Sequence, residues 1–145
     1  MPAWIEQGYA EYARRLNGSV TLSLTEIATP RKSNSQDAKI VKREEGEKLL
    51  AAIPAGAWVV ALDEHGKQWN SKALAGQLDA WAGRTQHVAL LVGGADGLDQ
   101  ACLDRADQTW SLSNLTLPHA MVRVLVAEQL YRAWSLNNNH PYHRA

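Results

Sequence analysis

The sequence predicts an α/β fold built on a mainly parallel sheet, because helix-like and strand-like segments alternate along the chain. Two continuous apolar runs of strand length, residues 58–62 (WVVAL) and 87–92 (HVALLV), are typical of parallel strands covered on both faces. The chain has 145 residues, of which 46% are hydrophobic and 21% charged. This is the size and composition of one globular domain, which we expect over residues 1–145.

The N-terminal part is predicted to hold two helices with a strand between them. Pro2 suits the first turn of a helix that ends at about Leu16. Apolar and polar residues then alternate over 19–27, which predicts a strand with one face more exposed to solvent than the other. After a polar loop, Asp37 is a plausible N-cap for a helix that reaches about Ile53.

The first buried strand and the elements after it follow from turn residues and helical spacing. A turn at 63–66 (DEHG) is followed by a helix at 71–83 that Ser71 can cap, and then by the second buried strand. After this strand come a glycine segment at 93–97 and a helix at about 98–107. The remaining elements are a short strand-like stretch at 110–117 and a long helix at 119–136.

The long helix is apolar around most of its circumference. Such a helix must be buried on every side, and in a chain this small a second subunit can supply the cover. We therefore expect a homodimer with this helix at or near the interface. The alternative is a central helix in the core of a monomer.

Several classes of site and location are disfavoured by composition. The single Cys102 excludes an internal disulfide framework and a cysteine-cluster metal site, and the five His show no metal-ligand spacing, so we expect no metal. No apolar run reaches the ~18 residues of a membrane span, and the N-terminus lacks the pattern of a signal peptide. We expect a cytoplasmic protein with no membrane association.

The formal net charge is zero, which argues against a protein that coats polyanions diffusely. Basic residues gather over 31–43 and in the C-terminal tail, so these are the expected contacts if RNA binds. From charge alone, the basic residues of the first segment are better explained as a solvated loop and helix face than as an RNA contact.

Three segments are candidates for chemistry. In LLVGGADG, glycines after a buried strand let a ligand approach the backbone, although a tight strand-to-helix turn explains them equally well. In SLSNLTLPH, residues 111–119, polar residues alternate with Leu, which suits a flat heterocycle such as adenine but also an ordinary short strand. The tail HPYHRA combines imidazole, phenol and guanidinium groups that can stack, bind phosphate and move a proton.

Taken together, these segments resemble one family. The sequence resembles bacterial large-subunit ribosomal RNA (pseudouridine-N3) methyltransferases of the SPOUT class in four segments. In chain order these are a GGxxGL segment after a buried strand, WSLSNLTLPH, MVRVLVAEQLYRAWS and a terminal HPYHR. The resemblance covers essentially the whole chain and is densest over 88–144. It implies a single three-layer α/β domain with a parallel sheet, a deep C-terminal trefoil knot, and an obligate homodimer.

The resemblance also implies S-adenosylmethionine as methyl donor and the ribosome, or its large-subunit rRNA, as partner. The implied cofactor contacts lie at three strand ends: Leu62, Gly93, Leu112, Ser113, Asn114, Leu115, Thr116 and Leu117. The implied reaction moves a methyl group to N3 of a pseudouridine in 23S rRNA, and we expect it to take place on the assembled ribosome. His143 is our candidate to accept the N3 proton, with Tyr142 and Arg144 holding the nucleotide.

One departure concerns the start of the chain. Members of the family usually begin with a β-strand, whereas this sequence starts almost at the helix that contains Trp4 to Leu16. Either the start of the chain was assigned too late or the protein lacks this strand. In the second case we expect an exposed sheet edge and lower stability, but no implied cofactor residue lies there.

Two other functions remain open. A non-catalytic, ribosome-associated RNA-binding module would keep the fold without turnover, but the intact LTLPH and YHR segments favour the enzyme. A small nucleotide-binding regulator would need a phosphate-cradling glycine motif, which is absent.

Overall fold

The computed structural model describes residues 2–16, 20–27, 38–94 and 96–144, with only the backbone of residues 143 and 144. The chain forms two compact units, each described by itself. The sheet unit comprises residues 25–68 and 85–116, and the helical unit comprises residues 1–24, 69–84 and 117–145. The expected single domain stays a prediction, and the expected Asp37 N-cap lies outside the described residues.

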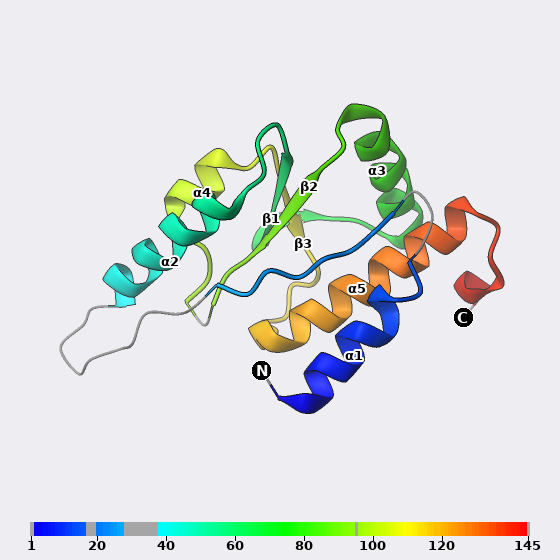
Figure 1. The fold of residues 1–145 in the computed structure, drawn as a ribbon, viewed down its shortest axis with the longest axis horizontal. Coiled ribbons are helices and arrows are strands. Elements are labelled where there is room, and N and C mark those ends of the chain that lie inside the picture. The colour runs from blue at the N-terminus through cyan, green and yellow to red at the C-terminus, as the bar shows by residue number, and fades with distance from the viewer. Residues whose placement is uncertain (1, 17–19, 28–37, 95, 145) are drawn as a thin grey trace. The chain divides into compact units, whose positions relative to one another are not determined.

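The sheet unit contains three parallel strands in the order β2-β1-β3. They are β1 (Trp58–Gln68), β2 (Val88–Val92) and β3 (Gln108–Ser111), with helices α2 (Ala38–Ala52) and α4 (Gln100–Arg105) side by side next to them (Figure 1). The predicted α/β fold with a parallel sheet is therefore confirmed.

The core of the sheet unit lies between one face of the sheet and the two helices. Side chains alternate between the faces of a strand, so Val59 and Ala61 of β1 point the same way. They pack with Leu91, Leu98 and Cys102, and this cluster is covered by Leu49 and Leu50 of α2 and by Ile53 just after it. These contacts explain why α2 forms a stable helix despite its weak apolar stripe.

The start of β3 is fixed to β1 by Asp107. Its main-chain N–H donates to Val59 O (2.8 Å), and its carboxylate Oδ2 accepts from Val59 N (2.9 Å). Two bonds to one residue leave little freedom for the two strands to slip past each other.

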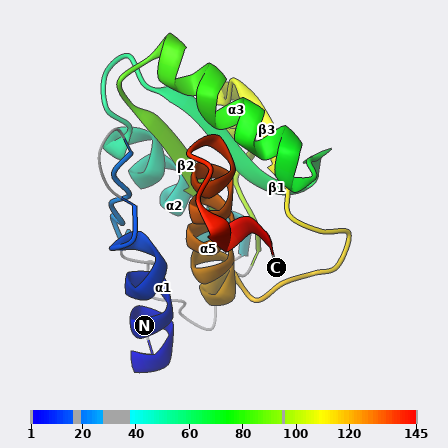
Figure 2. The ribbon, with the colours of Figure 1, turned by 90° about the vertical axis from the view of Figure 1, so that its right-hand side faces the viewer.

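The helical unit consists of α1 (Ala3–Ala13), α3 (Ser71–Arg84), α5 (His119–Asn137) and the short 3-10 helix η1 (Pro141–Arg144). Helix α5 packs against both α1 and α3, and η1 folds back beside its C-terminal end (Figure 2). Gly8 allows the close approach of α1, because a Cβ there would lie 3.3 Å from a methyl group of Val124. The predicted long helix at 119–136 is confirmed.

The strand expected at 19–27 is wrong, since the described residues 20–27 form no strand. A strand needs a neighbour for its backbone hydrogen bonds, and in the described part of the chain β1, β2 and β3 pair only with one another. Alternating polarity alone does not supply a partner.

The expected end of β1 at a turn over 63–66 is also wrong, because the strand continues to Gln68. Both Leu62 and Lys67 pair with Trp110, so the residues between them form an irregularity within the strand. Gly66 lets the backbone return to β3, since a Cβ there would lie 2.8 Å from Trp110 N.

Two further boundaries differ from those expected. Strand β3 ends at Ser111 rather than at 117, because the hydroxyl groups of Ser111 and Ser113 bond to the local backbone and compete with strand pairing. Helix α3 is capped by Asn70 rather than Ser71, with Asn70 Oδ1 accepting from Ala73 N at 2.8 Å.

We expect Leu91→Ala to lower the free energy of unfolding by about 2–5 kcal/mol, because it leaves a cavity in the sheet-unit core. Ile40→Ala on α2 is a matched control, since Ile40 is 39% exposed. The control should lower the free energy of unfolding by only about 0.5 kcal/mol. Urea denaturation measures both, and equal losses would contradict the assigned core.

Candidate functional site

The strand register brings three predicted site segments to one edge of the sheet. Leu62 pairs with Val92 on one side, immediately before Gly93, and with Trp110 on the other, shortly before Leu112. The strands are parallel, so the segments after β2 and β3 leave the sheet at its carboxyl edge, beside Leu62 within β1. Ligands of open α/β sheets bind at this edge.

The glycine segment after β2 forms a tight turn. A Cβ at Gly93 would lie 2.4 Å from the carbonyl carbon of Gly97, closer than any real contact. Gly97 has a φ of 81° and donates its N–H to Gly94 O at 3.0 Å. These glycines are therefore required by the chain's own packing, and the turn exposes backbone at the sheet edge.

A carboxylate from α2 fixes this turn. Glu45 Oε1 accepts a hydrogen bond from Gly94 N at 3.2 Å. The next residue, Gly46, allows α2 to approach α4, because a Cβ there would lie 2.9 Å from Asp99 Cβ. The sequence analysis missed Glu45, since no local pattern links it to a turn so distant along the chain.

The segment after β3 is irregular and held by side chains. Ser111 Oγ donates to Ser113 O (2.9 Å), Ser113 Oγ accepts from Leu115 N (2.9 Å), and Gln68 Nε2 donates to Asn114 Oδ1 (2.8 Å). Residues 114–116 are exposed, and Leu115 is 72% exposed. The last predicted cofactor residue, Leu117, belongs to the helical unit.

This edge of the sheet suits a ligand with a flat heterocycle and a positive charge. The exposed backbone at 114–116 lies outside the sheet ladder, and Leu112 and Leu115 offer apolar surface. The Glu45 carboxylate lies beside the glycine turn and complements a cation. An adenosine with a sulfonium group fits these groups chemically.

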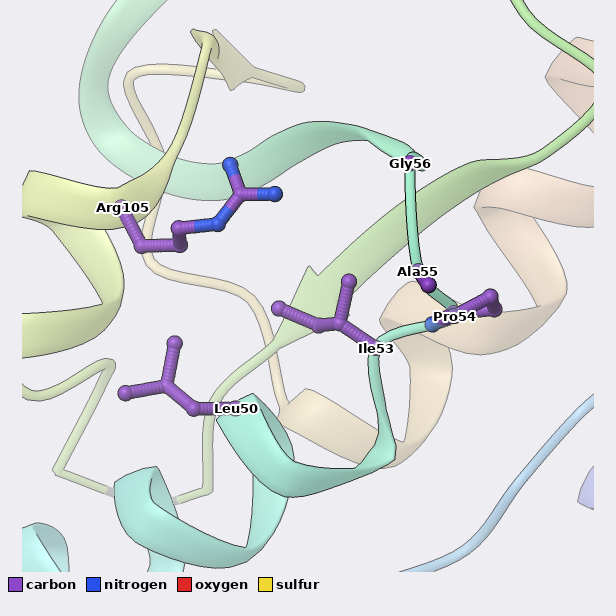
Figure 3. Close-up of a pocket in the computed structure, with 6 residues that line it drawn as sticks. All are labelled: Leu50, Ile53, Pro54, Ala55, Gly56 and Arg105. Atoms are coloured by element: carbon purple, nitrogen blue, oxygen red, sulfur yellow. The ribbon is translucent and has the colours of Figure 1, made fainter.

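A shallow depression in the sheet unit lies at the opposite end of the strands. It is lined by Arg105 and by residues 50 and 53–56, just before β1 (Figure 3). The Arg105 guanidinium also approaches Ala57 O and Asp107 Oδ2, each at 3.5 Å. This depression contains none of the predicted site residues.

The C-terminal tail is fastened within the helical unit. Asn139, with a φ of 56°, reverses the chain after α5, and His140 N donates to Ser135 O at 2.8 Å. The His140 ring contacts Tyr131 and Trp134, and its Nδ1 accepts from Tyr142 N at 3.3 Å. His143 and Arg144 follow within η1.

Tyr142 is half-buried, and its hydroxyl donates to Glu128 Oε2 at 2.8 Å. Burial raises the pKa of Tyr142 well above its ordinary value, and the bonds to Glu128 and Tyr12 raise it further. The phenol therefore stays protonated and acts as a donor. The sequence analysis missed Glu128, although its spacing of four from Arg132 on α5 is a recognisable ion-pair signal.

Cys102 is unsuited to nucleophilic catalysis. It is completely buried, and its Sγ donates to Gly46 O at 3.6 Å. Burial, together with Asp99 and Glu45, raises the pKa of the thiol. Cys102 instead packs in the sheet-unit core.

The searched residues, which are those the structure describes, contain no group of three or more His, Cys, Asp or Glu arranged to hold a metal ion. Within the same residues, no helix is both long and apolar enough to cross a membrane.

Comparison with known proteins adds an independent line of evidence. The family described as predicted SPOUT methyltransferase matches residues 1–143. Proteins named ribosomal RNA large subunit methyltransferase H are similar to this chain along nearly its whole length. The one from Marinomonas sp. (strain MWYL1) is 54% identical, over 99% of this chain and 93% of its own length. The one from Alkalilimnicola ehrlichii is 53% identical, over 100% of this chain and 93% of its own length.

SPOUT methyltransferases use S-adenosylmethionine as the methyl donor, which agrees with the donor expected from the sequence. The match along the chain, the parallel sheet and the turn at its carboxyl edge point to the same conclusion. The chain belongs to the SPOUT methyltransferase family.

Proposed function

We propose that this protein methylates N3 of a pseudouridine in large-subunit rRNA on the assembled ribosome. The observation that carries the proposal is the convergence of Leu62, Gly93 and Leu112 at one sheet edge, in a chain of the SPOUT family. The names of its relatives support large-subunit rRNA as the substrate.

The cofactor contacts are Leu62, Gly93 and residues 112–117. The exposed backbone at 114–116 can hydrogen-bond the adenine, and the leucines can pack against its face. When bound, S-adenosylmethionine supplies an electrophilic methyl group on a sulfonium, so the protein mainly has to align this group with the nucleobase.

The tail supplies the acid–base chemistry and holds the substrate. N3 of pseudouridine carries a proton that must leave as the new N–CH3 bond forms. His143 accepts this proton, while Tyr142 and Arg144 hold the nucleotide. Tyr142 is suited to this role as a neutral phenol, since its raised pKa keeps the hydroxyl protonated.

We further propose the homodimer, the C-terminal trefoil knot and the cytoplasmic location that the sequence led us to expect. The exposed apolar residues of α1 and α5 support the dimer, since Trp4 is 59% and Met121 40% exposed. Residues 122–125 of α5 are only half-buried in one chain. A second copy can cover this surface.

Incubation with isotopically labelled S-adenosylmethionine and ribosomes from a strain lacking this modification tests the reaction. We expect label on N3 of a single pseudouridine, located by mass spectrometry of the rRNA. Cofactor binding without any label would instead favour a non-catalytic RNA-binding module.

His143→Ala should abolish methyl transfer, because it removes the proposed acceptor of the N3 proton, while S-adenosylmethionine affinity and dimerisation stay unchanged. Calorimetry, sedimentation and a single-turnover assay measure these three properties. Unchanged turnover would remove His143 from the mechanism.

Gly93→Ala should weaken S-adenosylmethionine binding by tenfold or more and lower stability by about 1–3 kcal/mol, because the added methyl group collides with the Gly97 backbone. Gly76→Ala is a matched control on α3, where a Cβ meets nothing within 4 Å. It should raise stability by about 0.5–1 kcal/mol and leave affinity unchanged. Equal affinities in the two variants would contradict the assigned site.

A further inference from the structure

We propose that Glu128 is a positioning residue for methyl transfer, which holds the C-terminal turn η1 through Tyr142 and thereby fixes the position of His143. The inference rests on the proposed role of His143. It assigns a function to a carboxylate on α5 that the proposed mechanism does not use.

The Glu128 carboxylate is fully engaged by side chains of the helical unit. Its Oε2 accepts from Tyr142 Oη (2.8 Å), Arg132 Nη2 (2.9 Å) and Arg132 Nε (3.2 Å). Its Oε1 accepts from Gln129 Nε2 (2.7 Å). The Glu128 side chain is 15% exposed, so solvent screens these bonds only weakly.

The Tyr142 ring is held as firmly as its hydroxyl. It contacts Tyr131 with ring centroids 4.6 Å apart and Tyr12 at 6.4 Å. The Arg132 and Arg15 guanidinium groups lie 5.2 Å and 5.9 Å from its centroid. Residues of α1, of the turn after it, of α5 and of η1 thus form one cluster around this ring. We call it the tyrosine clamp (Tyr12, Arg15, Glu128, Tyr131, Arg132 and Tyr142).

The clamp acts on the residue next to it in the chain. Consecutive Cα atoms are about 3.8 Å apart, so displacement of Tyr142 necessarily displaces His143. An error of about 1 Å in the position of a reacting group can cost on the order of 100-fold in rate. A half-buried ion pair adds little net stability, so geometry explains the arrangement better than stability does.

Two isosteric variants test the proposal. Glu128→Gln removes the charge that Tyr142 and Arg132 share, and Tyr142→Phe removes the hydroxyl but keeps the ring. Glu6→Gln is the matched control, because Glu6 is an exposed carboxylate on α1. For each variant we would measure kcat and KM with ribosomes, S-adenosylmethionine affinity, thermal unfolding, and amide hydrogen exchange over residues 138–144.

We expect Glu128→Gln and Tyr142→Phe to lower kcat by about 10- to 100-fold, consistent with a displaced catalytic group. Hydrogen exchange in the tail should become faster, while cofactor affinity and the unfolding temperature stay close to the parent values. Glu6→Gln should leave every quantity unchanged. If Glu128 and Tyr142 had only a structural role, the two substitutions would accelerate hydrogen exchange in the tail without lowering kcat.

An unchanged kcat in both variants would overturn the proposal, and so would unchanged hydrogen exchange in the tail. Failure of the proposed function is distinguishable, because the parent protein itself would then transfer no methyl group to rRNA. Failure of the His143 role alone would leave His143→Ala active. Hydrogen exchange would still show whether Glu128 holds η1 in solution.

Discussion

The pairing of β1 with a strand on each side is the constraint on which the candidate site depends. Leu62 is aligned with Val92 and Trp110 at once, so the segments that follow β2 and β3 begin at the same edge. The two hydrogen bonds between Asp107 and Val59 fix this alignment at the other end of β3. A slip of one residue would reverse the face of every side chain on the strand and separate the site segments.

The sequence was sufficient to predict the elements whose signal is local. The two buried apolar runs became β1 and β2, and the apolar residues after Pro118 became α5. Two of the errors lie where the outcome depends on distant residues. Residues 20–27 alternate in polarity but have no strand partner in the described structure, and β1 continues past Leu62 because Trp110 accommodates a second pairing with Lys67.

In the candidate site, too, residues within local sequence patterns differ from residues whose contacts are distant along the chain. Gly93 and residues 112–117 could be named as candidates from the sequence, because glycines after a buried strand and the LTLPH segment are local patterns. Glu45 and Gln68 were not predictable, since each contacts a partner that lies far away along the chain. Family membership, methyltransferase chemistry and the methyl donor agree with the comparisons, whereas the roles of individual site residues stay predictions.

The tyrosine clamp joins the first helix of the chain to its last turn. Arg15 lies 5.3 Å from the ring centroid of Tyr12 and 5.9 Å from that of Tyr142, although Arg15 and Tyr142 stand near opposite ends of the sequence. Because synthesis proceeds from the N-terminus, α1 is made well before η1. The clamp therefore closes only after η1 has also been made, later than the contact between α1 and α5 can form.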